Sequence, residues 1–440
     1  MNRTVSAERL FLFSYFLVLI FIGTILLSIP AAWNGDERLY LIDALFTATS
    51  AVCVTGLITV DTALYSIFGK AVILFLIQTG GLGIISFTTL YLAAPRKRIS
   101  FRSIGFVKGY YLDTVEYKAE HIIRNIVLTT ITLELIGSVV IYIGFRKEGD
   151  FSYLNALFHS ISAFCNAGFS LFSDNLEAFT FNRWISGGIM VLIVLGGIGF
   201  VVLQDLAGRV TGKRARLHTH TKIVLLSSGF LIFAGTLGYL IFERNGTLEG
   251  YSGGARIMAA FFQSITTRTA GFNTISQGDM SLSSKVLTLP LMFTGGASGS
   301  IAGGVKVTTV FLVILSIFSS GDENAEVRFG KRKISGNDLK NASLFVIKAI
   351  LILFMSILAL SIAEGRGDAG FLQIVFESFS AFGTVGLSLG LTPELTGAGK
   401  FIIMLTMFAG RVGLISLAMN QPRKAIERQI RYPEGEVLIG

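Results

Sequence analysis

Long apolar runs constrain the fold of this chain more than any other feature of its sequence. Neither Leu10–Ile29 nor Ala71–Ala94 contains a charged residue. A helix needs about 20 predominantly apolar residues to cross the hydrocarbon core of a bilayer. Charged residues make up only 15% of the sequence, whereas a typical soluble domain carries roughly 25%. Most of the surface therefore cannot face water, and we expect an integral membrane protein.

Apolar runs recur along the whole chain and predict eight membrane spans. A shorter segment of mixed composition lies between the two members of each successive pair of runs. The expected spans are residues 10–29, 71–94, 122–145, 184–206, 223–242, 286–318, 342–363 and 401–419.

The four mixed segments resemble one another. In each of them a Phe lies ten residues before a Gly, and a Leu or Phe follows that Gly. A single match would carry little information, but four matches, each between two spans, indicate an internal repeat. The pairs are Phe46 and Gly56, Phe158 and Gly168, Phe261 and Gly271, and Phe376 and Gly386.

This repeat predicts the fold class. Non-helical backbone at membrane depth is tolerated only where protein buries it or where it lines a wet cavity, so the four loops should meet at the centre of the bundle. We expect an all-α integral membrane fold of four membrane–pore-helix–membrane repeats in a pseudo-four-fold arrangement around one central pore, with eight spans and four re-entrant pore helices. The predicted repeats are residues 1–94, 95–207, 208–318 (with a broken second span) and 319–420, followed by a cytoplasmic C-terminal tail at 421–440.

Basic clusters between the repeats predict the topology. They are Arg96, Lys97 and Arg98; Lys213, Arg214 and Arg216; and Lys331, Arg332 and Lys333. Cytoplasmic loops carry an excess of Lys and Arg, so these loops and both termini should be cytoplasmic in a multi-pass protein of the cytoplasmic membrane. The net charge of +9 is then a topology signal and a contact for anionic membrane lipids, and no nucleic-acid partner is expected.

The repeated glycines and the residues before them are the candidate cation site. Rings of backbone carbonyls replace the water around potassium in potassium filters, and Gly adopts the necessary backbone dihedrals without steric penalty. Helix packing through small residues is the alternative, but it does not explain four glycines in one context. The predicted ion-binding residues, whose backbone carbonyls should hold K+, are Val52, Cys53, Val54, Thr55, Gly56, Phe164, Cys165, Asn166, Ala167, Gly168, Thr267, Arg268, Thr269, Ala270, Gly271, Phe382, Gly383, Thr384, Val385 and Gly386.

Arg268 takes the position that Cys53 and Cys165 occupy in the first two repeats. A buried Arg should point away from the ion and donate to backbone carbonyls or to a carboxylate. Spacing alone suggests Glu377 as that carboxylate. The two cysteines are expected to pack behind the loops, because no metal-ligand spacing surrounds them.

The sixth span is too long and is interrupted by glycine. Five Gly between positions 295 and 304 cannot form a stable helix, because each costs about 1 kcal/mol relative to Ala. We expect a flexible loop just below the pore loops, where a gate belongs; a kinked or closely packed helix is the alternative. Arg411, a charge in the last span, should hold this loop or add a positive barrier. The predicted gate residues are Gly295, Gly296, Ala297, Ser298, Gly299, Ser300, Ile301, Ala302, Gly303, Gly304 and Arg411.

The sequence does not suggest an enzyme. Its spans lack paired acids, a nucleophile with its base and a cluster of metal ligands, and no motif for an organic cofactor is present. The alternative function is a secondary solute or ion symporter with discontinuous helices, but such transporters are built on a two-fold internal repeat.

With these motifs the chain resembles the ion-translocating subunits of the Trk/Ktr/HKT superfamily of potassium transporters, and in particular the bacterial Ktr type. The most specific stretches are Thr267–Asn273, Gly295–Thr309 and Phe382–Leu387. The resemblance implies potassium as the transported ion, with uptake often stimulated by sodium. It also implies a homodimer on a cytosolic ring of nucleotide-binding RCK-domain regulatory subunits. The glycines that match the family's filter are Gly56, Gly168, Gly271 and Gly386, Gly295–Gly304 matches its gating loop, and Arg411 matches the basic residue of its last span.

Overall fold

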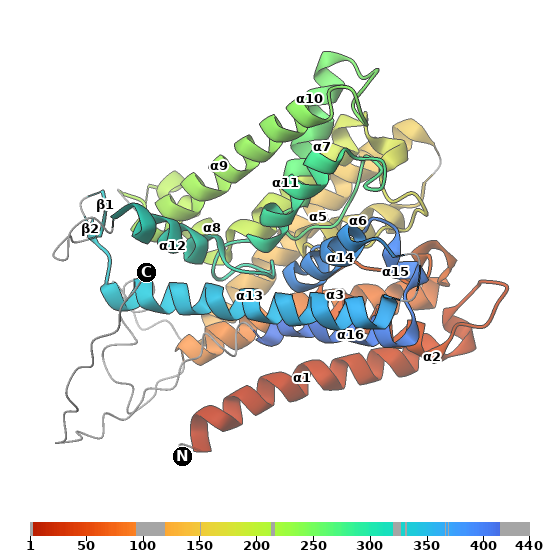
Figure 1. Ribbon diagram of the computed structural model, residues 1–440, viewed down its shortest axis with the longest axis horizontal. Coiled ribbons are helices and arrows are strands. Elements are labelled where there is room, and N and C mark those ends of the chain that lie inside the picture. The colour runs from red at the N-terminus through yellow and green to blue at the C-terminus, as the bar shows by residue number, and fades with distance from the viewer. Residues whose placement is uncertain are drawn as a thin grey trace.

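The computed structural model describes residues 3–93, 119–149, 151–212, 216–319, 327–330, 332–365, 367 and 369–413. This part of the chain is almost entirely helical (Figure 1), apart from one antiparallel pair of short strands, β1 (Arg328–Phe329) and β2 (Arg332–Lys333). The predicted all-helical fold class is confirmed. The basic residues at 96–98, 213–214 and 331, and the tail at 421–440, lie outside the described residues.

The helices follow one another in four groups. Each group has a long first helix, a short pore helix and a second helix that is long or interrupted. The first group contains α1 (Arg3–Ser28), α2 (Leu41–Cys53) and α3 (Ile67–Ala93), and the second contains α5 (Ala119–Glu148), α6 (Tyr153–Phe164), α7 (Arg183–Ile198) and α8 (Phe200–Val210). The third contains α9 (Thr219–Phe242), α10 (Gly253–Thr266), α11 (Leu282–Phe293) and α12 (Val307–Ser319). The fourth contains α13 (Gly336–Glu364), α14 (Phe371–Gly383), α15 (Leu391–Glu394), α16 (Gly397–Phe408) and a π-helical turn, η4 (Ala409–Gly413). Three 3-10 turns, η1 (Pro30–Ala32), η2 (Thr62–Leu64) and η3 (Glu177–Phe179), lie in the connections.

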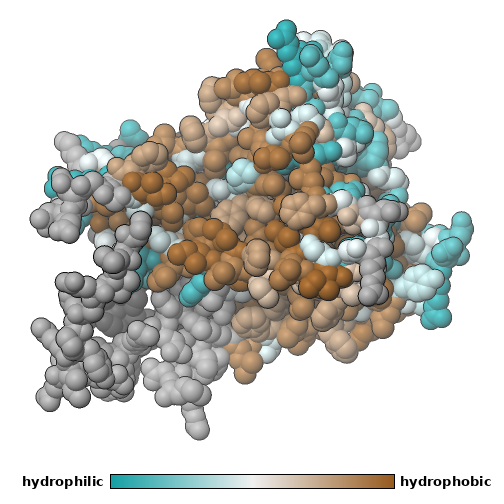
Figure 2. Space-filling model, viewed as in Figure 1, coloured by the Kyte–Doolittle hydropathy of each residue, from teal (hydrophilic) through white to brown (hydrophobic). Residues whose placement is uncertain are grey.

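The first helix of every group is long and apolar enough to cross a membrane. These stretches are Leu10–Ser28, Ile123–Glu148, Thr219–Phe242 and Gly336–Glu364. In the second group, α7 and α8 reach the necessary length only as a bent pair. Figure 2 shows apolar side chains along the flanks of the helices and hydrophilic ones gathered toward the ends of the bundle. This distribution is the one that a membrane-embedded bundle requires.

The four groups close into a ring. The second helix of each group packs against the pore helix of the next group: α3 against α6, α7 against α10, α11 against α14, and α16 against α2. The contact between the last and first groups includes an ion pair, in which Lys400 Nζ lies 2.7 Å from Asp43 Oδ1. This cyclic order brings the C-terminal ends of the four pore helices together.

The fourth span differs from its prediction. The sequence predicts one continuous span at 184–206, but α7 and α8 meet at an angle of 103° around Gly199. Gly199 has φ 90° and ψ 146°, a conformation that is costly for any residue with a Cβ. The backbone N–H of Phe200 donates to the carbonyl oxygen of Gly299 at 3.2 Å. The bend therefore depends on a contact with a segment distant in sequence, which spacing and composition do not reveal.

We expect Gly199→Ala to destabilise the protein. A Cβ at this position would lie 3.1 Å from the Ser298 carbonyl oxygen, and the strained backbone alone costs on the order of 1–3 kcal/mol. Gly212→Ala is the matched control, because Gly212 also has a positive φ, of 72°, but a Cβ there would meet nothing within 4 Å. Thermal unfolding in detergent should give a lower midpoint for Gly199→Ala than for the control. Equal midpoints would mean that the close approach of Gly199 to Ser298 O adds nothing to the cost of a positive φ.

Candidate functional site

Each pore helix ends in a short segment that turns sharply. We call residues 52–56, 164–168, 267–271 and 382–386 the pore-loop segments. In all four, the Gly and the residue two positions before it have a positive φ. Positive φ is uncommon in residues other than Gly, and such strained residues cluster at ligand-binding sites. They are Val54 (56°), Asn166 (56°), Thr269 (71°) and Thr384 (50°), paired with Gly56 (92°), Gly168 (71°), Gly271 (80°) and Gly386 (96°).

The four glycines form a closed ring with the carbonyl groups between them. Each glycine faces the carbonyl oxygen of the residue just before the glycine of the next repeat, and the fourth repeat closes on the first. Only Gly permits so close an approach, because a side chain would displace the neighbouring backbone. A Cβ added at Gly56 would lie 2.4 Å from Ala167 O, at Gly168 2.7 Å from Ala270 O, at Gly271 2.2 Å from Val385 O, and at Gly386 2.3 Å from Thr55 O.

Hydroxyl groups of the pore helices hold the pore-loop segments in place. The backbone N–H of Gly56 donates to Ser50 Oγ at 3.0 Å, and that of Gly386 donates to Ser380 Oγ at 3.1 Å. In the other two repeats the hydroxyl donates instead, from Ser162 Oγ to Phe169 O at 2.9 Å and from Thr266 Oγ1 to Phe272 O at 2.5 Å. These bonds give a structural reason for the hydroxyl residue near the end of each pore helix.

Three hydroxyl oxygens of the pore-loop segments lack a partner. Thr55, Thr269 and Thr384 are buried, and their hydroxyls make no hydrogen bond within the described part of the chain. Buried polar groups normally find a partner. Unpartnered oxygens in the same segments as a ring of carbonyls suit a cation that has lost its water. Among the residues that the sequence assigned to the pore loops, the four glycines and the residues just before them thus lie in one ring.

The Gly-rich loop, residues 295–304, lies against this ring and against the bend of α7. A Cβ at Gly303 would lie 2.0 Å from Thr384 Oγ1, in the fourth pore-loop segment. The backbone N–H of Ala297 donates to Gly197 O at 2.9 Å, and that of Ile301 donates to Gly196 O at 3.3 Å. These carbonyls belong to the last turn of α7, which has no helical partners of its own. The loop therefore supplies hydrogen-bond donors for carbonyl groups at the end of α7 that the bend leaves without helical partners.

Arg411 and Lys306 each donate a hydrogen bond to a carbonyl of the Gly-rich loop. Arg411, in the π-helical turn η4 and only 2% exposed, donates through Nη1 to Ile301 O and through Nη2 to Gly80 O at 3.4 Å. Lys306, at the start of the helix that follows the loop, donates to Ala302 O. Arg411 thereby joins the last span, the loop and the second helix of the first group.

The partner expected for Arg268 on spacing is wrong. The carboxylate of Glu377 accepts hydrogen bonds from Ser388 Oγ, at 2.8 Å, and from Thr392 Oγ1. Arg268 Nη2 donates instead to Ser228 Oγ at 3.1 Å and, at 3.5 Å, to the Gly295 carbonyl of the Gly-rich loop. Distance along the chain carried no information about which group the guanidinium would reach.

A second repeated motif, which the sequence analysis missed, lies in the second span of every repeat. The pairs are Gly80 and Gly81, Gly196 and Gly197, Gly295 and Gly296, and Gly410 and Arg411. In three repeats the first Gly lets the span touch its own pore helix: a Cβ would lie 2.0 Å from Val52 O at Gly80, 1.9 Å from Phe164 O at Gly196, and 2.0 Å from Phe382 O at Gly410. The signal was present in the sequence as a glycine pair in three of the four spans.

Acidic residues lie in the connections that follow the second and third pore-loop segments. Glu177 Oε1 accepts a hydrogen bond from Asn273 Nδ2 at 2.7 Å, which links the two connections. The pKa of Glu177 is raised, mainly because burial disfavours the charged carboxylate. The hydrogen bond from Asn273 opposes this shift, and the negative charges of Asp174 and Asp279 add to it. Three carboxylates are therefore close enough to influence one another, and such a cluster attracts cations.

Comparison with known proteins agrees with this geometry. Residues 2–427 match the family described as TrkH, cation transport protein. The chain is 39% identical over 430 residues to the Ktr system potassium uptake protein B of Bacillus subtilis, which covers 97% of this chain and 95% of that protein. It is 36% identical over 451 residues to the potassium/sodium uptake protein NtpJ of Enterococcus hirae, covering 100% and 98% respectively.

A solved structure shares the fold. The crystal structure of the potassium transporter TrkH from Vibrio parahaemolyticus matches 92% of this chain and 84% of that chain with a TM-score of 0.71, at 19% sequence identity. The matched family consists of cation transporters and is not an enzyme family. The family match over nearly the whole chain and the two close relatives lead to one conclusion: this chain belongs to the TrkH family of cation transport proteins.

Proposed function

We propose that this protein takes up potassium across the bacterial cytoplasmic membrane through the ring of pore-loop segments. The observation that carries the proposal is the closed ring, in which each of four glycines faces a carbonyl oxygen of the next repeat. Backbone oxygens in such a ring can replace the hydration shell of K+. The names of the two relatives, a potassium uptake protein and a potassium/sodium uptake protein, support the choice of cation.

The Gly-rich loop is the proposed gate. It lies against the fourth pore-loop segment and is held by Arg411, Lys306 and the last turn of α7. Its glycines allow it to move without breaking many side-chain contacts. Two arrangements of such a loop form a two-state element, whose balance a ligand or partner can shift.

The proposed assembly is a homodimer docked on a cytosolic ring of RCK-domain subunits that bind a nucleotide, with uptake stimulated by sodium. The support is the family resemblance, together with a relative named as part of a Ktr system. Basic residues between the repeats would lie on the cytoplasmic side with both termini. The proposed repeat boundaries, 1–94, 95–207, 208–318 and 319–420, follow from the same sequence pattern.

The symporter alternative is less well supported. Symporters with discontinuous helices are built from two related halves. The cyclic packing here repeats four times, once for every pore helix.

Flux through liposomes tests the proposal directly. Purified protein reconstituted into liposomes should take up potassium down a potassium gradient, and addition of an RCK-type partner with nucleotide should change the rate. Protein-free liposomes are the control. Absence of potassium uptake, with or without the partner, would reject the proposed function.

Substitutions at the ring glycines test the carbonyl site. Gly56→Ser and Gly386→Ser would each place a Cβ within 2.4 Å of a carbonyl oxygen of the neighbouring repeat. The resulting strain, about 1–3 kcal/mol, should raise the potassium concentration for half-maximal uptake roughly tenfold or more. These variants should also admit more sodium.

Gly390→Ser is the matched control for this measurement. Gly390 follows the fourth pore-loop segment and has φ 93°, but a Cβ there would meet nothing within 4 Å. Its potassium affinity should remain that of the unmodified protein. Unchanged affinity in both ring variants would contradict the carbonyl-ring mechanism.

Shortening the Gly-rich loop tests the gate. Deletion of residues within 295–304 should raise potassium flux in the absence of the partner and make it insensitive to the partner, with potassium still preferred over sodium. Arg411→Ala should act in the same direction, because a charge-assisted hydrogen bond contributes about 1.5–3 kcal/mol to the docked state. Arg183→Ala, at an exposed residue of α7, is the control. If a loop-deleted protein folds but conducts nothing, the loop is structural and the gate lies elsewhere.

A further inference from the structure

Arg268 differs in size and charge from the residues at the same position of the other pore-loop segments. These are Cys53, Cys165 and Gly383. Arg268 is only 9% exposed, so its side chain is enclosed by protein. A buried cation is costly unless other groups satisfy it. The hydrogen-bond partners of Arg268 should therefore explain how the third repeat accommodates this charge.

The guanidinium of Arg268 has only neutral partners among the described residues. Nη2 donates to Ser228 Oγ of α9 at 3.1 Å and to Gly295 O at 3.5 Å, the second being a long bond. Nε has no hydrogen-bond partner in the part of the chain that the structure describes. A guanidinium has five N–H donors in a rigid fork, so this one is far from saturated. It is therefore held by few contacts, and one of them belongs to the Gly-rich loop.

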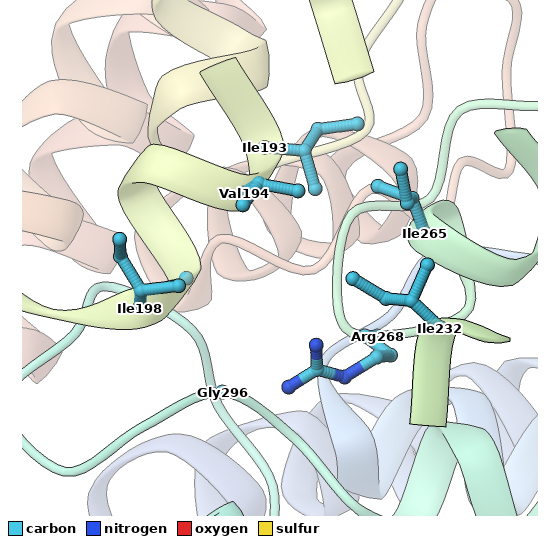
Figure 3. Close-up of a pocket in the computed structure, with 8 residues that line it drawn as sticks. Ile193, Val194, Ile198, Ile232, Ile265, Arg268 and Gly296 are labelled. Carbon is cyan, nitrogen blue, oxygen red and sulfur yellow. The ribbon is translucent and has the colours of Figure 1, made fainter. Parts of the chain in front are cut away.

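A small cavity lies beside this guanidinium (Figure 3). Its volume is about 20 Å3, room for roughly one water molecule. Its walls come from the last turns of α7, from α9, from the end of α10 and from the Gly-rich loop. The lining residues other than Arg268 are Ile193, Val194, Gly197, Ile198, Ile232, Ile265 and Gly296. In Figure 3 the side chain of Arg268 ends close to Gly296. On the side of this cavity, the guanidinium therefore lacks closely packed neighbours.

The residue next to Arg268 in the third pore-loop segment also lies close to the loop. A Cβ at Gly295 would lie 3.3 Å from Thr269 Cγ2, the side chain next to Arg268. Thr269 has a positive φ of 71°, so its conformation depends on its surroundings. The third segment thus approaches the loop through two neighbouring side chains, those of Arg268 and Thr269.

We propose that Arg268 is a positioning residue that couples the third pore-loop segment to the Gly-rich loop, so that the affinity of the ring for potassium depends on whether the loop is docked. This inference rests on the proposed function. With the loop docked, Gly295 O and Ser228 hold the guanidinium and, through it, the backbone of the segment. When the loop leaves, Gly295 O leaves with it, so the guanidinium keeps only Ser228 as a partner and the segment is less well fixed. Potassium then binds the ring more weakly, which favours release once the gate is open.

A double-mutant cycle tests this coupling in liposomes. Arg268→Lys keeps the charge, so it leaves the electrostatic potential at the ring nearly unchanged, but it removes the planar guanidinium whose Nη2 donates to both partners. With an intact loop, Arg268→Lys should raise the potassium concentration for half-maximal uptake about three- to tenfold, a change of roughly 0.7–1.4 kcal/mol. In a protein whose loop is freed by deletion or by Arg411→Ala, the same substitution should have no further effect.

Arg256→Lys is the matched control, because Arg256 lies near the other end of α10, far from the loop. It should leave the half-saturating concentration unchanged. Ser228→Ala removes one partner and retains Arg268, so it should give a smaller shift of the same sign, and it replaces Arg268→Lys if that variant does not fold. If Arg268→Lys changes the half-saturating potassium concentration equally with the loop docked and with the loop freed, Arg268 acts on the segment alone. If it changes this concentration in neither background, Arg268 has a purely structural role. Either outcome would overturn the coupling inference, whereas potassium uptake by the unmodified protein would still support the proposed function. Absence of uptake by the unmodified protein would reject the inference and the proposed function together.

Discussion

Every backbone N–H and C=O group at membrane depth must find a partner inside the protein, and the structure depends on how this requirement is met. Water is not available there, and each unsatisfied group costs several kcal/mol. The first helices of the four groups meet the requirement by themselves. The pore-loop segments, the bend at Gly199 and the Gly-rich loop do not, because each interrupts a helix. The interrupted segments pack against one another, so that the free N–H groups of one can bond to the free carbonyl groups of another.

The contact between the α7 bend and the Gly-rich loop shows how the solution works. Bending leaves carbonyls at the end of α7 without helical partners, and unwinding leaves N–H groups free in the loop. Ala297 and Ile301 donate to the α7 carbonyls, and Phe200 donates back to Gly299 O. Two irregular segments from different repeats thus complete each other's hydrogen bonding. It follows that neither segment can move without leaving polar groups of the other unpaired, unless water or a new partner replaces the bonds.

Much of this arrangement could be predicted from the sequence, because its determinants are local. The Phe and Gly spacing identified all four pore-loop segments, and the density of glycine identified the loop. The bend at Gly199 was not predicted, because its stabilising contact comes from residue 299 and the glycine resembles many others in the chain. The partner predicted for Arg268 was wrong for the same reason. Ser228 lies in another helix, and spacing along the chain does not indicate that the two residues meet. The paired glycines of the second spans were visible in the sequence, but their role was not. The structure shows that Gly80, Gly196 and Gly410 let these spans approach the pore helices closely.

The glycine pairs also bear on the symmetry of the molecule. Three repeats carry Gly at the second position of the pair, and the fourth carries Arg411. A ring assembled from four identical subunits would have to place four guanidinium groups at this level or none, and four buried positive charges would repel one another. Because all four repeats belong to one chain, each can diverge separately, and a single positive charge becomes accessible to selection. The covalent fusion of the repeats thus permits a single buried Arg in a bundle whose pore helices pack with nearly four-fold regularity.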